Sequence, residues 1–562
     1  MEVTQNGTER IGNIKNSQIP LIRMLDLIAT SRPQKTYCYI AKTEDIDDGF
    51  KPVTYNELLR AVNSMARWLI DALGPISTGK PQTVGYIGPD DLRYPIWNLA
   101  CIKAGRTALY PSTYNSPAGQ ISIVQSTGCM ILMAPATHKH LWDAALEGVE
   151  GTRYVEMPAL EVFLAPDELK AKEVEPDGQA EFGYSTSWDE VKDTVMHILQ
   201  SSGTTGTPKA LPYTNEMYLH AEILDERTRE DGATTMTKLF YGQRMLLNLP
   251  MSWMASNGMM LYFSLYTDLE CIIPPISAGP PFPPETLSKI MDMTDATIGL
   301  FTPDMIRQMT ASASSLSSLT RLKAIVYVGA GLDKETGDIL SQSTRVQSMY
   351  GATDAGLVPL MLSDRTDWQW TPLYTNFAGW ALEHFSSDLH ELVQRRRPDV
   401  DVAEQVYFGM YPNETVFHTK DLFREHPTKK GYWQMVGRTD DFVKLASMTK
   451  FNAVDIEAVI DRYKFVKGSL VAGDARRRTF VIVEPVEEIR DLSRDEVLDK
   501  TWPAIEEANK IITEEARLSR DLVLIASPDK PFQRTLKGTL SRRAVLAMYE
   551  AEIDELYKRN EA

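Results

Sequence analysis

The 562-residue chain contains only 4 cysteines and 8 histidines, which argues against several classes of protein at once. Cys38, Cys101, Cys129 and Cys271 are widely separated and form no Cys-x-x-Cys pair. Neither a disulfide framework nor a structural zinc site is therefore expected. We predict four free, mostly packed thiols, as in a protein of a reducing compartment.

Long apolar runs are also lacking. The most apolar stretch, residues 258–276, is interrupted by Asp268 and Glu270, which is too early for a membrane-spanning helix. Residues 1–13 lack the apolar segment of a secretory signal peptide. The sequence therefore predicts a cytoplasmic protein without a membrane partner.

Positive charge is scarce relative to negative charge. Lys and Arg number 59 against 76 Asp and Glu, and the formal net charge of −17 argues against nucleic-acid binding. Two short basic runs, residues 395–397 and 476–478, are interpreted as solvated loops rather than phosphate-binding tracks. The rest of the composition is typical of a globular protein with two or more domains.

Short β-rich runs alternate with helical stretches between about residues 20 and 440. The clearest runs are residues 83–88, 129–134, 194–199, 296–301 and 322–331. This alternation predicts an α/β architecture with largely parallel sheets. Residues 166–193 are interpreted as a surface insertion, and turn-forming residues predict loops at 276–287 and 311–319.

The pattern changes after residue 440. Two apolar runs flank a polar turn within residues 469–485 and predict a β-hairpin. A final helix over 542–559 would place Val545, Tyr549, Ile553 and Leu556 on one face. We predict a large N-terminal domain over residues 1–438, a hinge at 439–441 and a small α+β domain over 442–562.

The strongest chemical motif directly follows the apolar run at 194–199. It reads Ser201-Ser202-Gly203-Thr204-Thr205-Gly206-Thr207-Pro208-Lys209. Glycines let the backbone approach an anion, hydroxyls and amides supply donors, and Lys209 adds positive charge, which together suit a polyphosphate. Only two residues separate the glycines and no Gly-Lys-Ser/Thr follows, so this is not a Walker loop. By composition alone, a flexible linker would fit equally well.

This string resembles the phosphate loop of the adenylate-forming superfamily, which includes acyl-CoA synthetases, peptide-synthetase adenylation domains and luciferases. Further motifs of that superfamily follow in order, from about Tyr55 to Lys537. The resemblance implies a large domain of parallel-rich sheets with packed helices and a small mobile α+β domain. It also implies ATP and Mg²⁺ as cofactors and an acyl-adenylate as product.

The segment Tyr350-Gly351-Ala352-Thr353-Asp354 resembles the adenine and magnesium motif of the superfamily. The resemblance implies that Tyr350 stacks on adenine and that Asp354 binds Mg²⁺ between phosphates. Gly329 and Ala330 are expected to join the same nucleotide site. Taken alone, this segment could equally be a turn at the end of a strand.

Three further polar residues lie in motifs near the predicted domain boundary. By resemblance, Asp421 accepts hydrogen bonds from the ribose hydroxyls, Arg438 contacts the nucleotide and Asp440 is the hinge residue. The glycine that usually precedes the ribose-binding aspartate is replaced by Lys420.

The segment 531–539 resembles the motif of the mobile catalytic lysine, which implies that Lys537 contacts the reacting carboxylate and the α-phosphate. Lys209 would assist from the phosphate loop. The loop 444–452 resembles the one that helps form the pantetheine tunnel, but the usual glycine is replaced by Ser447 or Met448.

The acid pocket is predicted from spacing and resemblance together. Trp253 lies where the superfamily often has an aromatic residue or histidine beside the carboxylate, and Pro303, Gly331 and Val358 fall in segments that line the acyl site. A core role is the alternative for Trp253. Residues 251–260 contain no aspartate to pair with an α-amine, and an unpaired buried ammonium is costly. A non-amino acid, aryl or otherwise apolar, is therefore favoured.

Segments at 109–117, 421–427, 431–445 and 450–452 resemble adenylation domains of fungal peptide-synthetase-like carboxylate reductases. In such proteins a carrier domain presents a phosphopantetheine thiol and a reductase domain releases the product. The resemblance implies both as partners, in the same polypeptide or in trans, although neither module occurs in these 562 residues. Two alternatives stay open: a free-standing acyl- or aryl-CoA ligase, and a nucleotide-binding pseudoenzyme or interaction module.

Overall fold

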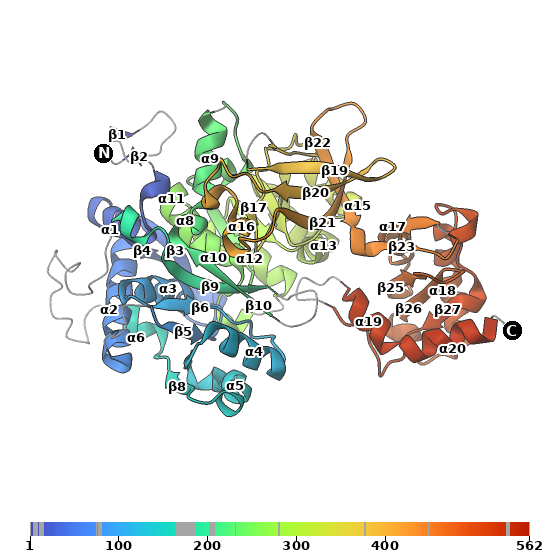
Figure 1. The fold of residues 1–562 in the computed structure, drawn as a ribbon, viewed down its shortest axis with the longest axis horizontal. Coiled ribbons are helices and arrows are strands. Elements are labelled where there is room, and N and C mark those ends of the chain that lie inside the picture. The colour runs from blue at the N-terminus through green and yellow to red at the C-terminus, as the bar shows by residue number, and fades with distance from the viewer. Residues whose placement is uncertain are drawn as a thin grey trace. The chain divides into compact units, whose positions relative to one another are not determined.

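The computed structural model describes residues 2–3, 9–10, 16–74, 76, 81–164, 187–201, 208–230, 232–278, 282–375, 378–447, 449–534 and 540–560. The chain forms two compact units (Figure 1). The first comprises Met1–Trp380 and Gln394–Phe417, and the second comprises Ala381–Val393 and His418–Ala562.

One sheet of the first unit has six strands in the order β10-β9-β6-β5-β7-β8. Its strands are β5 (Thr83–Tyr86), β6 (Thr107–Leu109), β7 (Ile131–Ala134), β8 (Arg153–Glu156), β9 (Val195–Ser201) and β10 (Lys209–Thr214). All neighbours are parallel except the antiparallel pair β9 and β10. The fully buried helix α3 (Arg93–Lys103) packs on β6 and β9.

The other large sheet of this unit has seven strands in the order β15-β14-β13-β11-β12-β3-β4. Its strands are β3 (Thr36–Ala41), β4 (Phe50–Thr54), β11 (Arg244–Leu247), β12 (Glu270–Ile273), β13 (Ile298–Phe301), β14 (Ala324–Val328) and β15 (Arg345–Met349). Only β3 and β4 pair antiparallel. The predicted α/β class with parallel-rich sheets is confirmed, and all five predicted strand runs contain a strand.

The prediction of a loop at 311–319 was wrong. These residues end helix α13 (Pro303–Ala311) and form most of helix α14 (Ala313–Arg321). Ser315, Ser318 and Leu319 are buried at a spacing of three and four residues, which is the period of one helix face. Packing of that face against helix α12 (Pro284–Thr294) therefore outweighs the modest helix preference of serine. Helix α12 also includes the last residues of the other predicted loop, 276–287.

In the second unit, strands β19 (Trp380–Ser386), β20 (Leu389–Arg395), β21 (Val416–Glu425) and β22 (Tyr432–Arg438) are neighbours in that order. A short antiparallel hairpin of β23 (Phe442–Lys444) and β24 (Lys450–Asn452) follows. The predicted hinge at 439–441, between β22 and β23, stays a prediction.

The C-terminal part of this unit is a three-layer α+β arrangement. Strands β25 (Val466–Ala472), β26 (Phe480–Pro485) and β27 (Val523–Ile525) form its sheet, and β25 and β26 are the predicted hairpin. Successive side chains alternate between two cores, Val471 facing helices α17 (Ala453–Ile460) and α18 (Arg494–Ala508) and Leu470 facing the C-terminal helices. The predicted final helix is broken at Tyr549 into α19 (Arg542–Met548) and α20 (Glu550–Asn560).

The four cysteines are buried and free, as predicted. Within the described ranges, no helix has both the length and the apolar character needed to cross a membrane.

Candidate active site

The carboxyl edge of the seven-stranded sheet carries most of the predicted site residues of the first unit. β11, β13, β14 and β15 are parallel neighbours, so their chains leave the sheet at the same edge. The segments that follow these strands contain Trp253, Pro303, Gly329–Gly331 and Tyr350, respectively. Ligands of α/β proteins bind at this edge, so the topology brings together residues that are far apart in the sequence.

Tyr350 opens a tight hairpin directly after β15. Strand β16 (Gly351–Ala352) pairs antiparallel with β17 (Gly356–Leu357), and Val358 donates its backbone N–H to the Tyr350 carbonyl at 3.1 Å. A Cβ atom at Gly351 would lie 2.5 Å from the Gly356 carbonyl oxygen, so a side chain at this position would collide with backbone. The predicted adenine residue Tyr350 and the predicted pocket residue Val358 are thus held together by this turn.

Asp354 lies in the turn of the same hairpin, half-buried, next to Ala352 and Thr353. The Tyr213 hydroxyl donates a hydrogen bond to the Thr353 carbonyl at 2.7 Å and fixes the turn. Burial raises the pKa of the Asp354 carboxyl, and the positive charge of Lys209 opposes that rise. The predicted metal ligand and the lysine of the phosphate motif therefore interact electrostatically.

The phosphate motif connects two paired strands. Ser201 ends β9 and Lys209 begins β10, and the two residues are direct cross-strand partners. Ser201 is half-buried and Lys209 is exposed. The central residues of the motif, Ser202, Gly203, Thr204, Thr205 and Gly206, lie outside the described residues.

Trp253 is half-buried, which argues against the alternative of a core side chain. It precedes helix α10 (Met254–Asn257), which continues into a π-helical turn, Gly258–Phe263, and then α11 (Ser264–Thr267). π-turns are rare and occur often at functional sites. Pro303, by contrast, is buried as the first residue of α13, an ordinary helix start.

Side chains from two segments pack closely beside this helix and leave no space for a water molecule between them. Residues 251–261 supply Met251, Ser256, Asn257, Met260 and Leu261, and the other side consists of Tyr94, Pro95 and Tyr110. The rings of Tyr94 and Tyr110 are stacked with centroids 5.8 Å apart. This packed region thus combines aromatic rings and methionines with the polar groups of Ser256 and Asn257.

Asp90 is a residue of this region that the sequence did not single out. Its Oδ1 accepts the backbone N–H of Met251 at 2.7 Å, two residues before Trp253. Burial raises the pKa of the Asp90 carboxyl to about 6, partly opposed by that hydrogen bond. Asp90 follows the carboxyl end of β5, a position that is itself a signal for a site in a parallel sheet.

In the second unit, Asp421 and Arg438 are cross-strand partners on β21 and β22. Arg438 Nη1 lies 3.1 Å from Asp421 Oδ1, and the Asp421 backbone N–H donates to Thr419 Oγ1 at 3.1 Å. Asp421 is buried and Arg438 is more exposed. The pair predicted to bind the ribose and the nucleotide is therefore preassembled.

The predicted hinge residue Asp440 lies in a 3₁₀ turn, Thr439–Asp441. Its carboxylate is 3.3 Å from Lys420 Nζ. Lys420 has φ = 64°, in the left-handed region that favours glycine, and it stands where the superfamily has glycine. The backbone shape of the motif is thus retained despite the substitution.

Two predicted elements are only partly visible. Lys537 and Met448 lie outside the described residues. The rest of the predicted tunnel loop connects β23 and β24, and the Ser447 hydroxyl donates to Thr449 Oγ1 at 3.0 Å.

Two family models match the chain. Residues 27–384 match the "AMP-binding enzyme" family, and residues 440–561 match the "AMP-binding enzyme C-terminal domain". The chain belongs to the AMP-binding enzyme family. It is therefore an adenylate-forming enzyme, as the motifs predicted.

Similar curated proteins include fungal reductases. A carboxylic acid reductase of Neurospora crassa is 27% identical over 95% of this chain and 50% of its own length. The adenylate-forming reductase Nps9 of Serpula lacrymans is 29% identical over 96% of this chain and 50% of its own length. The chain thus spans about half the length of these relatives.

Solved structures share the fold. An anthranilate CoA ligase bound to anthranoyl-AMP has a TM-score of 0.68 at 13% identity, over 94% of this chain and 97% of that one. ATP-bound MatB of Rhodopseudomonas palustris has a TM-score of 0.66 at 16% identity, over 94% of this chain and 99% of that one. The predicted fold of the superfamily is confirmed.

The residues present fit a magnesium-bound nucleotide. Asp354 offers one desolvated carboxylate. This matches the way Mg²⁺ is usually held, by one or two carboxylates together with substrate phosphates and water.

Proposed function

We propose that this enzyme adenylates a small aryl or other apolar carboxylic acid that is not an amino acid, and then transfers the acyl group to a phosphopantetheine thiol on a carrier domain. The proposal is supported by the contact between the Tyr350–Asp354 hairpin and strand β10, which begins at Lys209. The Tyr213 hydroxyl of β10 donates to the Thr353 carbonyl at 2.7 Å. This contact links the strand that carries an anion-binding cation to a hairpin with a carboxylate for a metal and an aromatic ring.

In the first step, the acid's carboxylate attacks the α-phosphorus of ATP in line and pyrophosphate leaves. Bound Mg²⁺ would neutralise charge on the phosphates, with Asp354 as its protein ligand. Lys209 would hold the departing phosphates, Tyr350 would stack on adenine and Lys537 would stabilise charge at the α-phosphate. These groups position the reactants, and none of them forms a bond to the acid.

The character of the acid is suggested by the side chains packed around Met251. They leave no space for a water molecule, so an acid would enter here only if these side chains moved. Stacked Tyr94 and Tyr110 suit a planar ring. Asp90 Oδ1 accepts the Met251 N–H and thereby supports the loop. Residues 251–260 themselves contain no carboxylate that could pair with an amine.

The thiol acceptor is inferred from the relatives. The two reductases, at 27% and 29% identity, are about twice as long as this chain, which supports carrier and reductase partners. Another relative at 27% identity is named an isocyanide synthase-NRPS hybrid. The altered Ser447–Met448 loop does not decide between a carrier and free CoA. A free-standing aryl-CoA ligase is therefore the second candidate, favoured by the fold match to an anthranilate CoA ligase.

The test is ATP–pyrophosphate exchange with aryl, α-keto, aliphatic and amino acids, followed by thioester formation with CoA or with a phosphopantetheinylated carrier. We expect exchange with an aryl acid and transfer to the carrier. Transfer to CoA alone would establish the ligase instead. Nucleotide binding without exchange on any acid would contradict the proposal and support a pseudoenzyme.

A further inference from the structure

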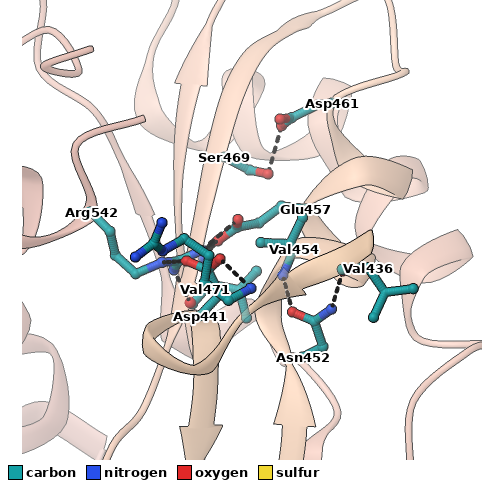
Figure 2. A network of polar contacts seen from close by, with 10 residues as sticks. Val436, Asp441, Asn452, Val454, Glu457, Asp461, Ser469, Val471 and Arg542 are labelled. Carbon is teal, nitrogen blue, oxygen red and sulfur yellow. Dashed lines mark hydrogen bonds and ion pairs between the residues drawn. The ribbon is translucent and has the colours of Figure 1, made fainter. Parts of the chain in front are cut away.

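Arg542, the first residue of α19, contacts three separate elements of the second unit. Its Nη2 atom donates to Glu457 Oε1 and Oε2 at 2.8 and 2.7 Å, and its Nη1 atom donates to the Val471 carbonyl at 2.8 Å. Its Nε atom lies 3.5 Å from Asp441 Oδ1. Figure 2 shows the guanidinium between these groups. The side chain is only 16% exposed.

The three partners lie on three different elements of the unit. Asp441 ends the predicted hinge turn, Glu457 belongs to α17 and Val471 to β25. Asp441 Oδ2 also accepts the backbone N–H of Arg438, the predicted nucleotide contact, at 3.2 Å. Arg542 therefore ties the hinge turn to the sheet and to the first helix that follows it.

The same arginine anchors one end of the chain around Lys537. Arg534 and Leu540 form an antiparallel bridge, and the Ser541 N–H donates to the Gln533 carbonyl at 2.8 Å, so the two flanks of residues 535–539 are paired. On the other flank, Arg534 Nη2 lies 3.2 Å from the buried Glu484 carboxylate. Arg542 therefore anchors the C-terminal flank through Glu457, and Arg534 anchors the N-terminal flank through Glu484. Both glutamates are buried.

We propose that Arg542 is a positioning residue for adenylation: it holds the hinge turn and the flanks of the Lys537 segment in one rigid body. This inference rests on the proposed function, because it assumes that Lys537 acts on the α-phosphate. A displacement of about 1 Å of a catalytic group can slow a reaction by about 100-fold. The lysine must therefore be delivered from a support whose parts do not move relative to one another.

The chemistry of the site favours this role over simple stabilisation. Burial raises the pKa of the Glu457 carboxyl to about 7, although Arg542 and the Val471 N–H oppose the rise. A buried ion pair of this kind is weak evidence for stability, since apolar residues of similar volume often serve as well. The planar fork of arginine, however, can satisfy acceptors from three elements at fixed angles, which neither lysine nor an apolar side chain can do.

The experiment compares Arg542→Lys, Arg542→Met and Asp441→Asn with wild type in ATP–pyrophosphate exchange, with melting temperatures measured alongside. Asp441→Asn removes the charge at the hinge turn but keeps an oxygen for the Arg438 N–H. Arg478→Met is the matched control, because Arg478 makes an exposed ion pair with Asp521 in the same unit.

We expect both Arg542 variants to lower kcat by about 10- to 100-fold while the KM for the acid changes less than about twofold. Asp441→Asn is expected to lower kcat severalfold with an unchanged melting temperature, and Arg478→Met to behave as wild type. Folded Arg542→Met and Asp441→Asn proteins with wild-type kcat would overturn the inference. If Arg542→Met does not fold, a wild-type kcat in the folded Asp441→Asn protein would by itself overturn the inference.

Lys537→Ala separates this inference from the proposed function. If Lys537→Ala retains exchange, the assignment of that lysine fails and the inference fails with it. If Lys537→Ala is inactive while the Arg542 and Asp441 variants match wild type, only the inference fails.

Discussion

Lys420 adopts a left-handed backbone conformation, with φ = 64°, and its ammonium lies 3.3 Å from the carboxylate of Asp440. The strained residue and the predicted hinge residue are therefore linked. Both side chains are about two-fifths exposed, so the ion pair contributes at most about 1 kcal/mol. The left-handed backbone costs a non-glycine residue about 1–2 kcal/mol.

Lys420→Gly is expected to increase the free energy of unfolding by about 0.5 kcal/mol, because relief of strain exceeds the loss of the ion pair and the added freedom of the unfolded chain. Ala475→Gly is the matched control, since Ala475 is exposed with φ = 58° and forms no ion pair. The free energy of unfolding should increase more in Ala475→Gly than in Lys420→Gly. Urea denaturation measures both, and a loss of stability in Lys420→Gly would show that the ion pair outweighs the strain.

Asp421→Asn is expected to raise the KM for ATP by about 10- to 100-fold, because hydrogen bonds to a charged group contribute about 1.5–3 kcal/mol. The fold should be retained, since asparagine keeps the size of the side chain on β21. Steady-state exchange at varied ATP measures the effect, with Glu425→Gln on the same strand as control. An unchanged KM would mean that Asp421 and Arg438 are only a cross-strand pair.

Asp354→Asn is expected to lower kcat for adenylation by about 100- to 1,000-fold, since it removes the charge at the predicted metal position. The Tyr213 bond to the Thr353 carbonyl does not involve the carboxylate, so the hairpin should persist. ATP–pyrophosphate exchange by wild type and by Asp354→Asn should be measured at increasing Mg²⁺ concentrations. Wild-type activity with an unchanged Mg²⁺ requirement would contradict the assignment. Asp304→Asn, whose side chain is half exposed in the first turn of α13, is the control.

Glu222→Gln is expected to change how stability depends on pH. Glu222, on α9 (His220–Glu230), is fully buried, and burial together with the charge of Asp225 raises its pKa from 4.5 to about 7. Because the folded-state pKa is raised, its favourable contribution is fully present below about pH 4.5 and is lost as the pH rises through 7. That loss amounts to at most about 3 kcal/mol.

Melting temperatures of wild type and Glu222→Gln should therefore diverge between pH 5 and 8, in favour of the variant at the higher pH. Glutamine can still accept the Tyr262 hydroxyl, which lies 2.9 Å from Glu222 Oε2. Glu335→Gln, at an exposed helix position, should leave the profile unchanged. A difference in melting temperature between wild type and Glu222→Gln that stays constant at all pH values would contradict the raised pKa of Glu222.

The sequence predicted the strand runs because buried parallel strands are short, apolar and bounded by turn residues. The site segments were predicted from their resemblance to the motifs of the superfamily, and in the structure four of them follow neighbouring parallel strands. The sequence did not predict helix α14, whose Ser315 and Ser318 face the core, because serine-rich composition alone does not show packing. Asp90 was missed because its contact with Met251 joins segments 161 residues apart.

Other features depend on side chains that meet only in the folded chain. The departure at Lys420 was visible in the sequence, but its retention of a glycine-like backbone was not. The convergence of Glu457, Val471 and Asp441 on Arg542 has no local signature, since these residues lie on different elements. Long-range polar contacts of this kind are set by topology rather than by pattern.

The most direct test of acyl-adenylate formation is ATP–pyrophosphate exchange by wild type and Lys537→Ala, each with the best acid of the panel. The account predicts acid-dependent exchange by wild type and a loss of nearly all exchange in Lys537→Ala at an unchanged melting temperature. Wild-type exchange by a folded Lys537→Ala protein would contradict the role of this lysine. No exchange by wild type with any acid would contradict the central claim itself.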